Sequence, residues 1–154
     1  MSSRKWLMKT EPTTYSIDHL VAENVTHWEG VRNYQARNFM KNDMRIGDDV
    51  LFYHSNTKVP GIVGLATVCS KSYPDFFSWD PDSNYFDPKS TKENPRWFMV
   101  DVKLKCKLDA VISLHKLKED PKLIGMTLLN KGSRLSVQPV SDTHYAHIIK
   151  AYTT

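Results

Sequence analysis

Two almost continuously apolar segments, joined by a short polar link, constrain the fold of this 154-residue chain more than any other feature. The first, RIGDDVLFYHSN, covers residues 45–56, and the second, GIVGLATVCS, covers residues 61–70. Each has a length typical of a strand, and the link TKVP has a length typical of a hairpin connection. Strands without polar alternation are typical of a sheet that is covered on both faces. The pattern therefore predicts a β-hairpin inside a covered sheet.

The remaining segments predict further strands and short helices in an irregular order. Strands are predicted at 5–10, 96–108 and 133–140, and helices at 17–23, 34–41, 113–120, 124–130 and 141–152. Ser16 and Asn33 are the expected N-caps of the first two helices, and Ser141 or Asp142 that of the last. Ile17, Leu20 and Val21 should form the buried face of the first helix. Because no regular βαβ rhythm occurs, we expect one α+β domain over residues 1–154, built on a small, mostly antiparallel barrel.

The composition indicates a globular protein without a membrane span. No apolar run approaches the roughly 18–20 residues that a transmembrane helix needs, and the N-terminus becomes polar too early for a signal peptide. Cys69 and Cys106 stand alone in strand-like text, which favours buried thiols in a reducing compartment. We therefore expect a cytoplasmic protein, or a nuclear one if the source has a nucleus.

The charge distribution makes phosphate-bearing partners plausible. The net charge is +4, and residues 96–134 hold nine Lys/Arg against four Asp/Glu. A basic surface attracts nucleic acid by Coulomb interaction and by release of counterions. Many small basic proteins bind no nucleic acid, so the charge alone does not assign a function.

Motifs for catalysis, metals and cofactors are missing from the sequence. There is no Gly-rich phosphate loop, no HExxH and no deaminase signature. His144 and His147 are close in helical text, where a solvated face is the better interpretation than a metal site. His54 and Ser55 are adjacent on a strand and point to opposite faces, so they cannot share a proton directly. We expect no catalytic residues, no metal site and no cofactor.

Binding features are denser, and they concentrate in the segment WEGVRNYQARNFM, residues 28–40. A planar base needs an aromatic face for stacking, hydrogen-bond partners for its edge and cations for its phosphate. Trp28, Asn33 and Arg32 supply one of each within six residues. The alternative for Trp28 is an ordinary core tryptophan.

Several long blocks in order resemble one known family, the EVE domain, and more narrowly the thymocyte nuclear protein family. They are WLMKTEPTTYSIDHL, WEGVRNYQARNFM, GDDVLFYHSN, GIVGLATV, YPD, YFDPKS, NPRWFMVDV and LSVQPV. The resemblance extends from about Trp6 to Ile148. It implies a PUA-like fold, a partly closed, mostly antiparallel β-barrel of about five or six strands with peripheral short helices. It also implies kinship with the YTH readers of methylated adenine in RNA.

The resemblance further implies a pocket that reads a modified base, such as 5-methylcytosine or 5-hydroxymethylcytosine in DNA or a modified base in RNA. On this sequence the pocket would consist of three groups: Lys9, Thr10 and Glu11 on one side, Trp28, Val31, Arg32 and Asn33 on the other, and Ser55 and Asn56 at the rim. Trp28 would then be a pocket wall. Phosphate contacts are expected from Arg37, Lys103, Lys105 and Lys107, in addition to Lys9 and Arg32.

The expected function is a non-catalytic, monomeric module that binds DNA or RNA carrying a modified base. Glu11 would accept a hydrogen bond from an exocyclic amine. Two alternatives remain open. One is a nuclease or another nucleic-acid-processing enzyme of the PUA-like superfamily, with Lys9, Glu11 and His54 as acid and base. The other is a sensor of free nucleotides.

Overall fold

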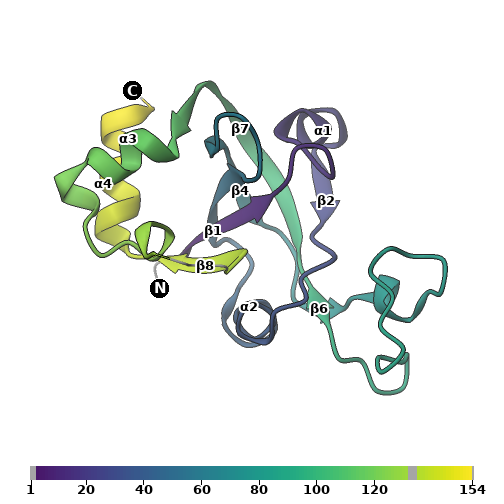
Figure 1. The fold of residues 1–154 in the computed structure, drawn as a ribbon. Helices are drawn as coiled ribbons and strands as arrows, with labels where there is room; N and C mark the ends of the chain where they lie inside the picture. The colour runs from purple at the N-terminus through teal and green to yellow at the C-terminus, as the bar shows by residue number, and fades with distance from the viewer. Residues whose placement is uncertain (1–2, 132–134, 154) are drawn as a thin grey trace.

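A curled six-stranded sheet forms the centre of the molecule in the computed structural model, which describes residues 3–131 and 135–153. The strands follow the order β2-β7-β4-β3-β1-β8 and enclose a half-barrel (Figure 1). Their bounds are Lys5–Thr10 for β1, Val25–His27 for β2, Asp49–His54 for β3, Gly61–Val68 for β4, Asp101–Ser113 for β7 and Val137–Val140 for β8. The predicted α+β, mostly antiparallel half-barrel is confirmed.

The predicted hairpin is present as β3 and β4, which pair antiparallel from Asp49 opposite Thr67 to His54 opposite Gly61. On its other side β3 pairs with β1 in parallel, and Lys5 lies opposite Asp49. Parallel neighbours need a crossover connection, and here α1, β2 and α2 provide it. As a result, the carboxyl ends of β1 and β3 lie side by side at one edge of the sheet.

Helices α1 and α2 begin at their predicted caps. Helix α1, Ile17–Glu23, follows Ser16, whose hydroxyl accepts a hydrogen bond from the backbone of His19 at 3.3 Å. Helix α2, Tyr34–Asn38, follows Asn33, whose side-chain oxygen accepts from the backbone of Ala36 at 3.0 Å. Beyond Asn38 the predicted helix changes to a π-helical turn, η1, over Phe39–Asp43.

The C-terminal part of the chain is mainly short helices. Helix α4, Asp142–Tyr152, is capped by Ser141, and α3 covers Leu114–Glu119. The predicted helix at 124–130 is reduced to one 3₁₀ turn, η4 at Thr127–Leu129, and another 3₁₀ turn, η3 at Pro121–Leu123, precedes it. No helix in the described ranges is long and apolar enough to cross a membrane.

The sheet separates two hydrophobic clusters, which explains why its central strands are apolar on both sides. Alternate residues of β1 and β3, such as Met8 and Phe52, pack with α1, α2 and Trp28. The intervening residues, such as Leu7 and Leu51, pack with α3, η3, η4 and α4. Successive residues along each strand therefore pack into different hydrophobic clusters.

Residues 75–97 form a long excursion from the sheet, which we call the 75–97 segment. It begins after β5, Tyr73–Pro74, contains the 3₁₀ turn η2 at Phe76–Trp79, and returns at β6, Phe98–Met99, which pairs with β5. Figure 1 shows this segment extending from the sheet on the side opposite α3 and α4. The strand predicted at 96–108 is thus divided into β6 and the longer β7.

Several predicted environments were wrong. Val21 is 47% exposed because α1 buries only Ile17 and Leu20. Cys106 is exposed and Cys69 is half-buried, and both thiols are free. His147 does not lie on a solvated face, since its Nε2 is 2.6 Å from the carboxylate of Asp120. Of the strand predicted at 133–140, residues 133–134 lie outside the described residues.

Candidate functional site

A pocket of about 420 Å³ opens at the edge where β1 and β3 end together. Five parts of the chain line it: residues 9–15 at the end of β1 and beyond, residues 27–31 at the end of β2 and beyond, Ser55 after β3, and the single residues Tyr85 and Ser136. The lining consists of Lys9, Thr10, Glu11, Thr14, Tyr15, His27, Trp28, Glu29, Gly30, Val31, Ser55, Tyr85 and Ser136. Its volume falls within the range of small-molecule sites in proteins.

Trp28 forms part of this pocket and also belongs to the core. Its side chain is only 7% exposed, and its ring packs edge-to-face on Phe52 with centroids 5.4 Å apart. Its backbone nitrogen donates to the carbonyl of Val100 at 2.8 Å. The two alternatives for this residue therefore do not exclude each other, because one edge of the indole is buried while the side chain still reaches the pocket.

Lys9 brings a partly buried amine to the pocket. Its backbone nitrogen donates to the carbonyl of Ser136 at 2.7 Å, which holds the end of β1 beside the segment that precedes β8. The Nζ atom lies 5.8 Å from the ring centroid of Tyr53. No carboxylate of the described residues lies within ion-pair distance of it, and burial lowers the pKa of the Lys9 amine. The Lys9 amine is therefore a hydrogen-bond donor for which the contact with Tyr53 offsets only part of the free-energy cost of burial.

Glu11 lies at the rim and is held by the neighbouring turn. Its side chain is exposed and accepts from the Asn56 amide at 3.1 Å. The backbone nitrogens of Thr14 and Tyr15 donate to its carbonyl, each at 2.9 Å. Asn56 itself is a partner of Glu11 at the rim rather than part of the lining.

Sequence reasoning missed the acid that lies deeper in the pocket, Glu29. Burial raises the pKa of its carboxyl, and the Nε2 atom of His27 lies 3.5 Å from Glu29 Oε2. Glu29 stands between Trp28 and Gly30, and this position next to Trp28 is the sequence feature that could have identified it as a pocket residue. Because Lys9 also lines the pocket, the lining offers both an acceptor and a donor to a planar polar ligand.

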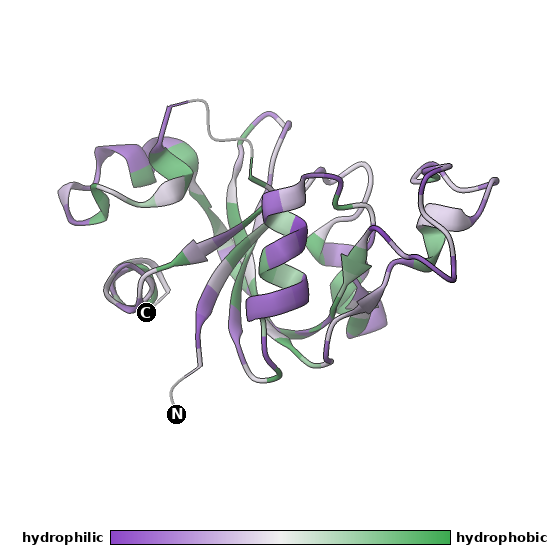
Figure 2. Ribbon diagram, turned by 90° about the horizontal axis from the view of Figure 1, so that it is seen from below, coloured by the Kyte–Doolittle hydropathy of each residue, from purple (hydrophilic) through white to green (hydrophobic). Residues whose placement is uncertain are grey.

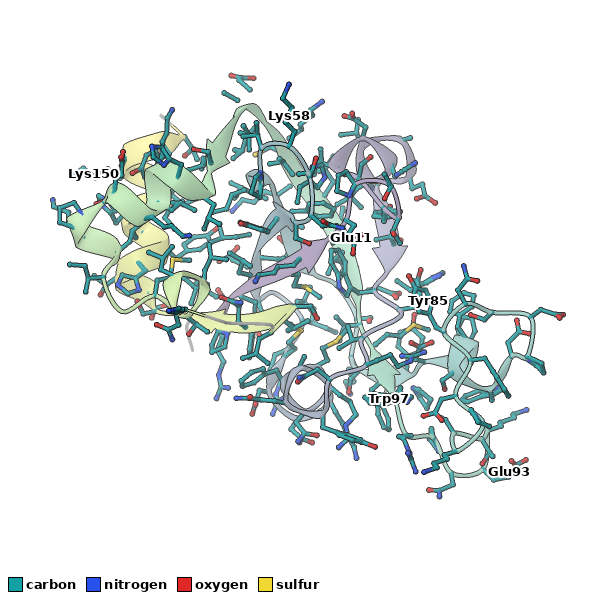
Figure 3. All side chains as sticks on the ribbon, viewed as in Figure 1. Glu11, Lys58, Tyr85, Glu93, Trp97 and Lys150 are labelled. Carbon is teal, nitrogen blue, oxygen red and sulfur yellow. The ribbon has the colours of Figure 1, made fainter. Side chains whose placement is uncertain are left out.

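Tyr85 also reaches the pocket, although it comes from the 75–97 segment. Its ring lies so close to Gly30 that a Cβ atom there would come within 2.6 Å of it, and Gly30 has a positive φ of 84°. Figure 3 labels Tyr85 and Trp97 where this segment meets the rest of the molecule, and Glu93 at its far end. Burial raises the pKa of the Tyr85 hydroxyl. No pattern in the sequence predicts that Tyr85 lies beside residues 28–31.

An anchor formed by Arg32 and Asp75 positions Tyr85. The fully buried Asp75 carboxylate accepts from Gly30 N at 2.9 Å and from Arg32 Nη1 at 3.0 Å. Arg32 Nη2 donates to the carbonyl of Tyr85 at 2.6 Å, and the guanidinium stacks near the Tyr85 and Trp97 rings at 5.6 and 5.3 Å. The Arg32–Asp75 pair therefore holds both Gly30 and Tyr85, two residues of the pocket lining, in place.

This arrangement corrects the expected roles of Arg32 and Asn33. Neither side chain lines the pocket. The Arg32 guanidinium is occupied by Asp75 and by main-chain carbonyls. The Asn33 oxygen is occupied as the N-cap of α2. Six other predicted pocket residues do line it: Lys9, Thr10, Glu11, Trp28, Val31 and Ser55.

The three lysines of β7 that were expected to contact phosphates, Lys103, Lys105 and Lys107, do not share one environment. Lys107 Nζ lies 2.6 Å from Asp18 of α1, whereas Lys105 Nζ lies 3.7 Å from Asp49 of β3. The pairing of β7 with β4 shifts register between Leu65 and Ala66, opposite residues 104–106, and this interrupts the alternation of side chains. Lys103 is exposed, and Arg37 Nη1 donates to the carbonyl of Arg96 at 2.9 Å.

His54 does not support acid–base chemistry in the pocket. Its Nε2 accepts from the backbone nitrogen of Ile17 at 3.1 Å, which ties β3 to the start of α1. Burial lowers the pKa of His54, as expected for an imidazole that acts as a neutral acceptor. It is also absent from the pocket lining.

The chain is similar to proteins of one family over almost its entire length. The family model described as EVE domain matches residues 4–151. Human thymocyte nuclear protein 1 is 38% identical over 165 residues, which cover 96% of this chain and 73% of that protein. The chain spans 66–75% of the length of the curated relatives it matches.

Solved structures are also similar to this chain over almost its entire length. A hypothetical protein from Leishmania major has a TM-score of 0.93 and 51% identity, covering 97% of this chain and 94% of that one. The human THYN1 protein, solved in complex with 5-methylcytosine containing DNA, has a TM-score of 0.90 and 36% identity, with 96% of each chain covered.

Proposed function

Since the chain belongs to the EVE domain family, we propose that it binds nucleic acid that carries a modified base, and that the base enters the pocket at the ends of β1 and β3. The observation that carries this proposal is the likeness to the human protein solved with 5-methylcytosine containing DNA, at a TM-score of 0.90. Among modified bases, we therefore propose 5-methylcytosine in DNA as the preferred ligand.

The pocket has the properties that a flipped-out base requires. Leaving the stack costs a few kcal/mol, so the pocket must supply stacking and edge contacts in return. Trp28 and Tyr85 are large aromatic side chains of the lining, and the Tyr85 ring covers Gly30. Stacking on an aromatic side chain is worth roughly 1–3 kcal/mol per base. Trp28 and Tyr85 therefore supply the apolar surface.

The polar groups of the lining suit the edge of cytosine. An exocyclic amine donates, and a carboxylate is its usual acceptor. Glu29 and Glu11 are the carboxylates of the lining, and Lys9 supplies the amine that donates to the ring nitrogen or carbonyl. Uracil and thymine present a carbonyl where cytosine has its amine, so an ionised Glu29 would disfavour them.

Binding rather than catalysis is the proposed activity. The matching family and the similar proteins carry no catalytic description. The acid and base pair considered from the sequence included His54, which lies outside the pocket. Incubation of labelled DNA and RNA with the pure protein, with and without a chelator, gives intact strands if this is correct.

The decisive experiment compares affinities for otherwise identical oligonucleotides. We would measure binding to duplex DNA with one central 5-methylcytosine, cytosine or thymine, to the matching RNA, and to free 5-methylcytidine. Tighter binding of the 5-methylcytosine duplex than of the other two duplexes supports the proposal. Equal affinity for all three duplexes contradicts it, and tight binding of the free nucleoside would assign a small-molecule sensor instead.

A further inference from the structure

A second hollow, of about 520 Å³, lies at the opposite end of β3 from the pocket. It is lined by Lys41, Met44, Arg45, Ile46, Lys71 and Ser72, and we call it the basic hollow. Its residues come from η1, from the turn before β3 and from the segment after β4. The pocket lies after β3 and the basic hollow before it, so the length of that six-residue strand, about 20 Å, separates them.

Three cations surround the basic hollow, and none of them is neutralised in the described part of the chain. No carboxylate of residues 3–131 and 135–153 lies within ion-pair distance of Lys41, Arg45 or Lys71. Two carboxylates near Arg45 in sequence have partners other than these three cationic side chains. Asp43 lies 3.7 Å from Arg4, and the buried Asp48 accepts from Trp6 Nε1 and from the backbone nitrogens of Arg4 and Arg45. The excess positive charge is therefore local.

Internal contacts hold two of these cations in place. Arg45 Nη1 donates to the carbonyls of Asn42 and Met44 at 3.0 and 3.1 Å. Lys41 Nζ lies 4.8 Å from the ring centroid of Phe98, and the Lys41 carbonyl accepts from Ser72 Oγ at 3.1 Å. A positioned guanidinium beside lysine amines is the arrangement that proteins use to bind phosphate oxygens.

A ladder of aromatic and cationic side chains connects the pocket with the basic hollow. Tyr85 at the pocket faces Arg32, and Arg32 faces Trp97 at 5.3 Å. Trp97 stacks on Tyr34 with centroids 4.9 Å apart, and Tyr34 is 52% exposed. Arg37 covers Tyr34 at 4.9 Å. In Figure 2, α2 and η1 lie in front of the sheet and are largely hydrophilic, and they lead from Arg37 to Lys41.

Alternating aromatic and basic side chains along a surface are typical of sites that bind a nucleic-acid strand. We propose that the basic hollow binds a backbone phosphate of the strand whose base enters the pocket, and that the ladder lies along the path between them. This inference rests on the proposed function for the identity of the ligand. It assigns the phosphate contacts to residues that the sequence did not single out, in place of the β7 lysines.

The test removes the three charges together and measures the dependence of DNA affinity on salt. A Lys41→Ala, Arg45→Ala, Lys71→Ala protein is compared with wild type and with a control in which Lys116, Lys118 and Lys122 are changed to Ala. The control loses the same charge from exposed positions on α3 and η3, which Figure 1 places on the other side of the molecule. Duplexes with 5-methylcytosine and with cytosine are titrated at several salt concentrations.

Loss of one phosphate contact should reduce the slope of log affinity against log salt by about 1, and weaken binding roughly tenfold at 0.1 M salt if affinities converge near 1 M. The preference for 5-methylcytosine should not change. A slope equal to that of the control would overturn the inference while leaving the proposed function intact. A reduced slope without any base preference in wild type supports the inference and contradicts the proposed function. No DNA binding by wild type overturns both.

Discussion

Trp28 illustrates how one residue serves the core and the candidate site together. Its indole packs on Phe52 and still lines the pocket. Truncation to alanine would remove both contributions and cost about 3–5 kcal/mol of stability, so loss of binding would be ambiguous. A variant that keeps an aromatic ring separates the two roles.

We expect Trp28→Phe to retain the fold and to weaken binding of the 5-methylcytosine duplex by about 1 kcal/mol, roughly fivefold, because a smaller ring offers less stacking surface. Fluorescence anisotropy and thermal unfolding measure the two effects. Phe52→Leu is the matched control: it disturbs the same edge-to-face contact from below without lining the pocket. It should lower the melting temperature and leave base preference unchanged. If Trp28→Phe lowered the melting temperature without weakening binding, Trp28 would be a core residue only.

The two carboxylates of the pocket make separate predictions. Glu11→Gln and Glu29→Gln keep the side-chain shape, and the variant that removes the acceptor of the base amine should lose about 1–3 kcal/mol of preference for cytosine-type bases. We expect the larger loss for Glu29, since Glu11 already accepts from Asn56. Glu93→Gln, which changes an exposed acid at the far end of the 75–97 segment, is the control. Unchanged preference in both pocket variants would leave base recognition to Lys9 and backbone groups.

Glu29 also predicts a dependence of stability on pH. Its folded pKa is raised above 4.5, so the folded state binds the proton more tightly than the unfolded state does. The resulting stabilisation is complete below pH 4.5 and is lost as the pH rises through the folded pKa. Glu29→Gln should remove this part of the pH profile when unfolding is followed by circular dichroism. An identical profile for wild type and variant would contradict the burial of this carboxyl.

At the scale of elements, the 75–97 segment belongs to the site only because a few contacts hold it there. Asp75 accepts from Gly30, Arg32 and Phe77, and Tyr85 covers Gly30. The segment otherwise extends away from the sheet (Figure 1). Disturbing the contact at Gly30 should therefore move Tyr85 more than it disturbs the core.

Gly30→Ala tests this arrangement against a matched control, Gly47→Ala. Both glycines have positive φ, 84° and 97°, so each substitution should cost about 1–2 kcal/mol of stability from backbone strain. A Cβ at Gly47 would meet nothing within 4 Å, whereas one at Gly30 would overlap Tyr85. We expect similar losses of melting temperature but weaker base binding only for Gly30→Ala. Equal binding by the two variants would exclude Tyr85 from the site.

At the scale of the whole molecule, a polar cluster joins the C-terminal helix to the rest of the fold. The Asp120 carboxylate accepts from Tyr152 at 2.7 Å and lies 2.6 Å from His147 Nε2, and both partners belong to α4. The cluster lies beside the second hydrophobic core, to which Ile148 and Tyr145 contribute. It connects η3 to α4 across 27–32 residues of sequence.

These hydrogen bonds lower the pKa of Asp120 to about 2, from an ordinary 3.8. The stabilisation is therefore present above pH 3.8 and is lost as the pH falls toward 2. We expect Asp120→Asn to unfold more easily than wild type at neutral pH, with a difference that narrows in acid. Thermal unfolding between pH 2 and 7 measures this, with the exposed Asp109→Asn as control. A difference that does not narrow in acid would contradict the role of the Asp120 charge.

Much of the local structure was predictable from the sequence, because its signals depend on near neighbours. The apolar segments 45–56 and 61–70 predicted the hairpin, and Ser16 and Asn33 predicted the starts of α1 and α2. Caps and turns involve residues three or four positions apart, so their chemistry is visible in the sequence. Resemblance to a family then supplied the half-barrel and six of the residues that line the pocket.

The tertiary structure alone decided the other half of the site. The parallel pairing of β1 with β3 brings Lys9 and Ser55 to one edge, and the Arg32–Asp75 anchor brings Tyr85 to Trp28 over more than fifty residues. A register shift opposite residues 104–106 sends Lys105 and Lys107 to different partners. Local patterns determine which residues form a strand or a helix. Pairing and packing between distant segments depend on the free energy of the whole arrangement, and that determines which side chains meet.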